Sequence, residues 1–375
     1  MHKSHSKNIY LDHNATSYIC EDAYNAMISL LRLPLNPSSV HHHGRIARHY
    51  LEHARQTVRE MIGANSNFKV IFTASGTEAN NLALNGIENR RILISAIEHP
   101  SVFKAIKDAD IISVNSDGVV NLEHLENLLI QNKDTKPIFI SVILANNETG
   151  VIQPIKEVAR LAKQYNAILH TDGSQCPSRI LINIDDLGID LITLSSHKIG
   201  GPPGVGALVV RDTIDLTPII KGGGQEYRIR SGTHNVAAIY AFAVACSLAN
   251  KRIHAFQSHV LELRNYIEAE LLDLGAIIFG YNAMHRLPNT SSIGMNGLQG
   301  ISQVIYFDNN GISVSAGSAC SSGSIGNPYI QTAMGFNLDI ANTAIRVSLS
   351  DINTKSEIES FIAHWRKLKL SKSNV

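Results

Sequence analysis

Only four cysteines occur in the 375 residues: Cys20, Cys176, Cys246 and Cys320. None lies in a C-x-x-C pair or at a zinc-site spacing from another cysteine. Scattered thiols in a chain of this length exclude a disulfide framework and favour a reducing compartment. Cys246 lies in the apolar helical run YAFAVACSLAN, so we expect it in the core.

The chain also lacks an excess of charge, since its formal net charge is +1. This balance excludes the broad basic surface that nucleic-acid binding needs. No apolar run reaches the length of a membrane span, and MHKSHSKNIYLDHNATS at the start has no apolar block of signal-peptide length. We therefore expect a soluble, cytoplasmic protein that binds neither nucleic acid nor membrane directly.

What the chain does contain is a regular alternation of β-type runs and helical stretches. The runs are KVIFT (69–73), RILIS (91–95), DIISV (110–114), PIFISVIL (137–144), AILHTD (167–172), DLITLS (190–195) and GALVVR (206–211). Such alternation predicts an α/β fold with a mostly parallel central sheet covered by helices on both faces.

The pattern changes after Asn235. Two helical stretches are expected at about 235–250 and 254–273, followed by the strand-like runs AIIFG, TSSIGM, GISVS and AIRVSLS and a closing helix in TKSEIESFIAHWRKLKL. We predict a large domain at 15–255. Residues 1–14 and 256–375 are expected to form a smaller α+β domain.

The turn after the run at 69–73 is a candidate phosphate site. SGTEAN (75–80) opens a predicted helix with Gly76 and Thr77 in its first turn, where free N–H groups attract anions. An ordinary helix cap is the alternative interpretation. The segment is not a P-loop, because the G-x-x-x-x-G-K-[ST] spacing is absent.

Lys198 directly follows an apolar strand in LSSHKIGGPPGVGALVV. A lysine at a sheet edge with few other charges nearby can lose its proton and form a Schiff base; a surface turn is the alternative. Asp172 ends the run AILHTD, where a carboxylate either caps a turn or pairs with a buried cation such as a pyridinium nitrogen. A phosphate site, an aspartate and a lysine at one sheet edge are what pyridoxal 5'-phosphate (PLP) requires.

Other polar residues are open to more than one interpretation. His99 in EHPSV could stack on a flat cofactor and shuttle protons, or be structural. Arg346 in AIRVSLS should meet a carboxylate, from either an internal acid or a substrate. The Gly-rich segment 221–235 is either a second anion contact or a mobile loop. His49 and His53 lie one helical turn apart without the glutamate of H-E-x-x-H or a nearby cysteine, so we expect no metal site.

Short motifs along nearly the whole chain follow the order found in one enzyme family. They are YLDHNAT, NPSSVHHHGRIARHYLEHAR, FTASGTEANNLA, EHPSV, NNETGVIQPI, HTDGSQ, SSHKIGGPPGVGAL, GGGQEYRIRSGT, RLPNTSSI, SAGSACSSG and IRVSLS. With them the chain resembles the NifS/IscS-like cysteine desulfurases of the class V aminotransferase group. This resemblance implies a PLP-dependent transferase of fold type I.

The resemblance also implies how PLP is held. Lys198 would bind it covalently, Asp172 would pair with the pyridine nitrogen, Gln175 would contact the ring oxygen, and His99 would stack on the ring and take part in proton transfer. The phosphate would be held by Gly76, Thr77, Ser195 and His197. Arg228 stands where the family usually has glycine, and Cys176 lies close to the implied cofactor.

For catalysis, the resemblance implies that Cys320 is the nucleophile. It would take sulfur from L-cysteine as a persulfide, leave L-alanine, and pass the sulfur to an acceptor protein. The small residues of SVSAGSACSSGSIG predict a loop free enough for the thiol to reach both places. Arg346 would bind the substrate carboxylate and Asn147 would lie beside the ring and substrate. Thr233 would reach the phosphate in the partner subunit, which implies a homodimer.

The acceptor could serve iron–sulfur cluster biogenesis, tRNA thiolation or another sulfur modification. Two alternatives use the same fold: a selenocysteine lyase, or an aminotransferase, which has no use for Cys320. A third alternative is a non-catalytic scaffold protein, which would not need Lys198.

Overall fold

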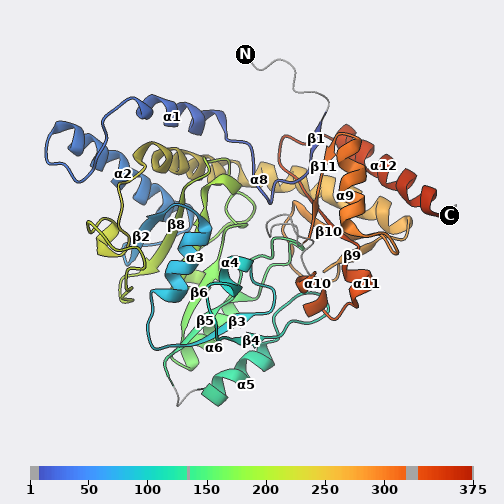
Figure 1. Cartoon of the computed structure of the whole chain (residues 1–375), viewed down its shortest axis with the longest axis horizontal. Helices are drawn as coiled ribbons and strands as arrows, with labels where there is room; N and C mark the ends of the chain where they lie inside the picture. The colour runs from blue at the N-terminus through green and yellow to red at the C-terminus, as the bar shows by residue number, and fades with distance from the viewer. Residues whose placement is uncertain (1–7, 133–135, 318–327, 374–375) are drawn as a thin grey trace.

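The computed structural model describes residues 8–132, 136–317 and 328–373. A larger body surrounds the central sheet, and helix α8 (Val236–Asp273) runs from it into a smaller body (Figure 1). We expected two helices here, but α8 is continuous over 38 residues. Its sequence contains no glycine or proline to interrupt it. The predicted domain boundary near residue 255 falls inside α8 and stays a prediction.

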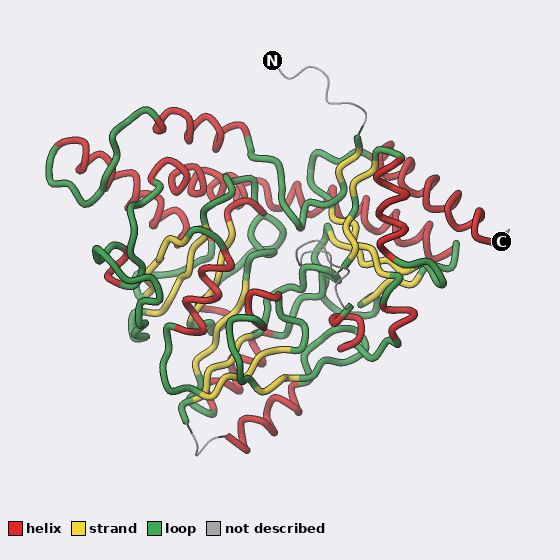
Figure 2. Tube along the Cα trace, viewed as in Figure 1, coloured by secondary structure: helices red, strands yellow, loops and turns green. Residues whose placement is uncertain are grey.

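The central sheet has seven strands in the order β2-β8-β7-β6-β5-β3-β4. Their bounds are β2 (Phe68–Thr73), β3 (Arg91–Ser95), β4 (Asp110–Ile112), β5 (Ile138–Ser141), β6 (Ile168–Asp172), β7 (Leu191–Ser195) and β8 (Gly206–Arg211). Figure 2 shows strands in yellow with helices, in red, around them. Strand β8 runs antiparallel to both of its neighbours, and the other pairs in this sheet are parallel. The mostly parallel sheet is therefore confirmed, and each predicted strand forms.

Apolar side chains leave both faces of this sheet. Along β2, Val70 and Phe72 enter one core cluster whereas Ile71 enters another. Helices α1 (Glu21–Leu31), α2 (His42–Met61), α5 (Leu122–Asn132), α6 (Ile155–Gln164), α7 (Ile184–Leu187) and the start of α8 contribute to the first cluster. Helices α3 (Gly76–Asn85) and α4 (Pro100–Phe103) cover the second face. Helices on both faces explain why the strands are apolar throughout.

The smaller body contains a four-stranded antiparallel sheet in the order β12-β13-β10-β9. Its strands are β9 (Ile277–Phe279), β10 (Thr290–Gly294), β12 (Ser315–Ala316) and β13 (Ala344–Ser348), and its helices are α9 (Gly300–Asn309), α10 (Tyr329–Ala333), α11 (Leu338–Ala341) and α12 (Lys355–Ser373). Near the N-terminus, β1 (Ile9–Tyr10) pairs in parallel with β11 (Ile312–Ser313). Leu11, Phe307 and Trp365 share one core there with the second half of α8.

Among the described residues, α8 is the one helix that is long and apolar enough to cross a membrane by length and composition. However, 61% of its most apolar window is buried inside the protein. Ala241 and Phe242, in the first half of α8, are fully buried in the core cluster to which α1 and α2 also contribute. These contacts are those of a core helix.

Candidate active site

The turns that follow β2, β3, β5, β6 and β7 converge on one cavity of about 210 Å³. Ten residues assigned from the sequence to cofactor, substrate or catalysis line it: Gly76, Thr77, His99, Asn147, Asp172, Gln175, Ser195, His197, Lys198 and Arg346. The carboxyl ends of parallel strands meet at one edge of a sheet, which is why these segments come together.

The N-terminus of α3 forms one wall of this cavity. Ser75 Oγ accepts a hydrogen bond from the Glu78 N–H (3.1 Å), and the Glu78 carboxylate accepts one from the Ala74 N–H (2.8 Å). These two hydrogen bonds fix the first turn. A Cβ built on Gly76 would lie 3.2 Å from Ser174 Oγ and 3.4 Å from Ser195 Cβ, so a side chain would fill the space in front of the helix. A phosphate fits such a helix start.

Asp172 ends β6 and is only 5% exposed. Its carboxylate accepts hydrogen bonds from the Ser174 N–H (2.9 Å) and from Asn80 Nδ2 (2.8 Å). Burial alone would raise the pKa of Asp172, but the charge of Lys198 and these hydrogen bonds outweigh it and lower the pKa below its ordinary value. The carboxylate is therefore ionised at neutral pH and suited to a cationic ring nitrogen.

Lys198 lies in the 3-10 helix η1 (Ser196–Lys198), directly after β7. The His197 carbonyl accepts a hydrogen bond from the Ser17 N–H (3.0 Å), which ties this turn to the N-terminal segment. Burial and the charge of Lys198 lower the pKa values of His99 and His197 to about 4. Both imidazoles are therefore neutral at pH 7.

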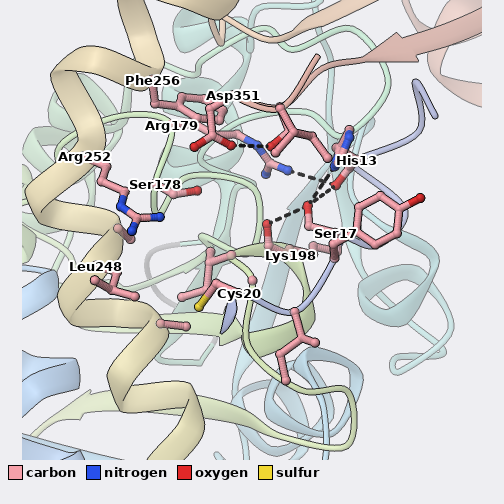
Figure 3. Close-up of a pocket in the computed structure, with 18 of the residues that line it drawn as sticks. His13, Ser17, Cys20, Ser178, Arg179, Lys198, Leu248, Arg252, Phe256 and Asp351 are labelled. Atoms are coloured by element: carbon pink, nitrogen blue, oxygen red, sulfur yellow. Dashed lines mark hydrogen bonds between the residues drawn. The ribbon is translucent and has the colours of Figure 1, made fainter. Parts of the chain in front are cut away.

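Lys198 also lines a second cavity, of about 270 Å³, together with His13, Cys20 and Arg179 (Figure 3). Arg179 is 2% exposed and donates hydrogen bonds to the Gln175 carbonyl (2.7 Å), to Gln175 Oε1 (2.5 Å) and to the His13 carbonyl (3.2 Å). Because Oε1 is held by Arg179, the amide orientation of Gln175 is fixed. Arg179 was not among the residues assigned from the sequence, although a basic residue four positions after Gln175 was a usable signal.

Arg346 lies on β13 and is 1% exposed. Its guanidinium donates to Asp12 Oδ1 (2.7 Å) and to the Asn147 carbonyl (3.1 Å). Asp12 is thus an internal acid paired with Arg346, one of the two kinds of partner that the sequence pattern allowed. Arg346 also lines the cavity, so its role toward a substrate carboxylate stays a prediction.

Several cavity residues were not anticipated: Asn14, Ala15, Ser75, Asn80, Ser101, Ile143 and Ser174. Asn80 lies one helical turn after Gly76, and Ser101 follows His99 by two residues, so both spacings carried a signal. Asn14 lies in the motif YLDHNAT, but its spacing from the other cavity residues carried no signal, because only tertiary contacts bring its segment here.

The remaining sequence assignments concern thiols and the segment before α8. Cys246 is fully buried, as predicted, and Cys176 is also fully buried, which raises the pKa of its thiol. Thr233 is exposed and does not line the cavity of its own chain. Cys320 lies outside the described residues. Ser315, on the strand that precedes Cys320 in the sequence, is paired with Arg346 across the sheet.

Comparisons with known proteins show the family of this chain. A family model described as aminotransferase class-V matches residues 9–361. The chain belongs to the class V aminotransferase family. Within 94% of its length it is 35% identical to the cysteine desulfurase IscS of Dictyoglomus turgidum and to the cysteine desulfurase IscS 1 of Archaeoglobus fulgidus, covering 92% and 94% of those proteins. It is also similar to the crystal structure of a NifS-like protein from Rickettsia africae, with 39% identity, a TM-score of 0.91 and coverage of 96% and 99% of the two chains.

Proposed function

We propose that this class V family member is a cysteine desulfurase, which converts L-cysteine to L-alanine and keeps the sulfur as a persulfide on Cys320. The observation that carries the proposal is the single cavity that joins the α3 N-terminus, ionised Asp172 and Lys198. Strand β12, which precedes Cys320 in the sequence, pairs with β13 at Arg346. The full-length similarity to cysteine desulfurases supports the same conclusion.

The cavity fits PLP as the cofactor. Gly76, Thr77, Ser195 and His197 would hold the phosphate. His99 would stack on the ring, Asp172 would pair with its nitrogen and Gln175 would contact its oxygen. Lys198 would hold the aldehyde carbon. The buried Oδ1 of Asn147 has no hydrogen-bond partner within the described chain, which leaves it available to a bound molecule. When bound, PLP supplies an electron sink that loosens bonds around the amino-acid carbon atoms.

The chain's own residues bind the substrate and accept its sulfur. Arg346 and Asn147 orient the substrate carboxylate, and neutral His99 exchanges a proton in the cavity. The Cys320 thiolate attacks the sulfur of L-cysteine, so a sulfur–sulfur bond forms while the substrate carbon–sulfur bond breaks. The carbon takes up a proton and leaves as L-alanine, and Cys320 retains the persulfide.

The sulfur of the persulfide must pass to an acceptor. We propose that a cytoplasmic acceptor protein, of iron–sulfur cluster biogenesis or of a thiolation pathway, receives the sulfur. We further propose a homodimer in which exposed Thr233 reaches the phosphate in the partner's cavity. Arg230 supports this loop, since it donates to Glu78 at the start of α3 (2.8 Å).

The test compares purified holoenzyme variants with L-cysteine and a thiol reductant. We expect Cys320→Ser to lower sulfide release by about 100-fold or more, because the nucleophile is lost. Lys198→Ala should lose both activity and the absorption band of lysine-bound PLP. Cys20→Ser is the matched control and should retain activity.

The other candidate functions predict different results. A Cys320→Ser enzyme that still transaminates, with no sulfide release even in the parent protein, would identify an aminotransferase. Full turnover of L-selenocysteine with little turnover of L-cysteine would identify a selenocysteine lyase. A parent protein that stays colourless with PLP would leave the scaffold alternative.

A further inference from the structure

A chain of hydrogen bonds on the cavity wall joins two residues of the proposed site through two others. Asn80 Nδ2, on α3, lies 2.8 Å from Asp172 Oδ2 and 2.8 Å from Ser101 Oγ. Ser101 Oγ, on α4, lies 2.7 Å from His99 Nδ1. Asn80 and Ser101 are 1% and 8% exposed, so water does not compete for these bonds. The proposed function assigns no role to either residue.

The chemistry of the groups fixes the direction of each bond. An ionised carboxylate only accepts, so the atom of Asn80 that faces Asp172 is its NH2 group. The second hydrogen of that group goes to Ser101 Oγ. Ser101 Oγ therefore receives one hydrogen bond and can donate its own hydrogen to His99 Nδ1.

A second donor reaches the same ring nitrogen. The backbone N–H of Ser101 lies 3.1 Å from His99 Nδ1, in the cap of α4. A backbone N–H can only donate, so Nδ1 must present its lone pair. The proton of the neutral imidazole then sits on Nε2. The charged groups that act on the ring are Lys198, Asp172 and Arg346, and burial together with Lys198 keeps the ring neutral at pH 7, with its pKa lowered to about 4.

We propose that Asn80 and Ser101 are positioning residues that hold His99 as the Nε2–H tautomer, so that His99 meets bound molecules as a donor. No proton travels from Asp172 to His99 along this chain, because the amide of Asn80 donates in both directions. For Nε2 to act as a base, the proton would have to move to Nδ1 and both hydrogen bonds from Ser101 would break. The catalytic use of this donor rests on the proposed function, but the tautomer does not.

The tautomer can be measured without turnover. Protein labelled with 15N in the histidine rings is examined by solid-state NMR at pH 7, with and without PLP, and the His99 signals are assigned by their loss in His99→Gln. We expect an unprotonated Nδ1 and a protonated Nε2 in both forms. A protonated Nδ1, or protons on both nitrogens, would overturn the proposal and leave the desulfurase proposal standing.

Variants test whether the two side chains do the positioning. In Ser101→Ala and Asn80→Ala we expect the two nitrogen signals to move part of the way toward each other, because the backbone N–H of Ser101 (3.1 Å) alone then favours the Nε2–H tautomer. Ser101→Thr keeps the hydroxyl and should restore the parent spectrum. The matched control is Asn81→Ala on the same helix, whose amide donates to the Thr77 carbonyl and not to this chain. Unchanged His99 signals in folded Ser101→Ala and Asn80→Ala would refute the positioning role.

Kinetics give an independent readout. If His99 is the donor, Asn80→Ala and Ser101→Ala should lower kcat for alanine formation roughly tenfold with little change in KM, because a loosened ring misplaces the reacting proton. Loss of activity in every variant, Asn81→Ala included, would point to a general folding defect and contradict this expectation.

Discussion

Glu98 shows how one buried residue makes stability depend on pH. It is fully buried next to His99, and its Oε1 accepts hydrogen bonds from Ser95 Oγ (2.5 Å) and from the Ile143 N–H (2.6 Å). Its Oε2 has no partner within the described residues. Burial outweighs these hydrogen bonds and raises the pKa of Glu98 from its ordinary value of 4.5 to about 8. Glu98 is therefore protonated in the folded protein at pH 7.

This raised pKa predicts that alkaline pH destabilises the fold. Between pH 4.5 and about 8 the folded protein holds a proton on Glu98 that the unfolded chain has released. The free energy of unfolding therefore falls as the pH rises through this range, by up to about 1.4 kcal/mol per pH unit from this group. Glu98→Gln cannot ionise and should remove that slope, as measured by urea unfolding at pH 6, 7 and 8 at one protein concentration. Glu88→Gln, at an exposed position, should keep the parent slope; parallel slopes for Glu98→Gln would show that Glu98 is ionised.

At the scale of elements, the 3-10 helix η2 (Glu226–Arg228) consists of three of the six described non-glycine residues with positive φ. Glu226, Tyr227 and Arg228 have φ values of 44°, 58° and 66°, in the left-handed region. Arg55 holds the segment through two hydrogen bonds to the Glu226 carboxylate, at 2.6 and 2.8 Å. The same carboxylate accepts from His234 Nε2 (2.6 Å), next to Thr233. A buried ion pair thus fixes the loop that we propose to reach the partner subunit.

Removing one member of this ion pair should be costly. Glu226→Gln leaves the Arg55 guanidinium buried without its counter-charge, and we expect the free energy of unfolding to fall by about 3–5 kcal/mol. Glu52→Gln is the control, because Glu52 pairs with the same arginine from the surface, where its side chain is 62% exposed. That variant should change stability by less than about 1 kcal/mol. Equal effects of the two variants in urea unfolding would contradict the role of the buried pair.

The strained backbone of Arg228 predicts that one substitution raises the free energy of unfolding. Arg228 is exposed and stands in a left-handed conformation that suits glycine. Arg228→Gly should raise the free energy of unfolding by about 0.5–1 kcal/mol, because relief of strain exceeds the extra freedom that glycine gains in the unfolded chain. Arg228→Ala keeps the strain and should show no gain. A lower melting temperature for Arg228→Gly would indicate that the arginine side chain itself supports the loop.

On the scale of the whole molecule, the position of Thr233 bears on whether two subunits share a site. It is exposed and does not line the candidate active-site cavity of its own chain. If Thr233 is a phosphate ligand, as proposed above, this position requires a site shared between two subunits. Each cavity would then need Lys198 from one chain and Thr233 from the other.

Mixed dimers test this arrangement. Lys198→Ala and Thr233→Val proteins should each be impaired, and unfolding and refolding them together should restore activity. The reason is that each mixed dimer has one cavity with both native residues. Sulfide release from L-cysteine is measured before and after mixing. No gain on mixing, with dimers confirmed by light scattering, would place Thr233 outside the partner's site.

The local sequence was sufficient for the strands of the larger body. The run 91–95 is strand β3 with the predicted bounds, because an apolar stretch between polar turns forms a buried strand wherever it packs. The polar turns after these strands were likewise predictable as one cluster. In contrast, the continuity of α8 through residues 250–254 depends on packing in two cores at once, which no local window contains.

The sequence by itself determined the parallel sheet and the residue types at its carboxyl edge, because periodicity and turn chemistry act over a few residues. Only the tertiary structure decided which polar groups face one another. Asn80 meets Asp172 across 92 positions, and Arg55 meets Glu226 across 171. Burial and the neighbouring groups that the fold brings together set the protonation states of Asp172, His99 and Glu98, because a pKa depends on neighbours in space rather than along the chain.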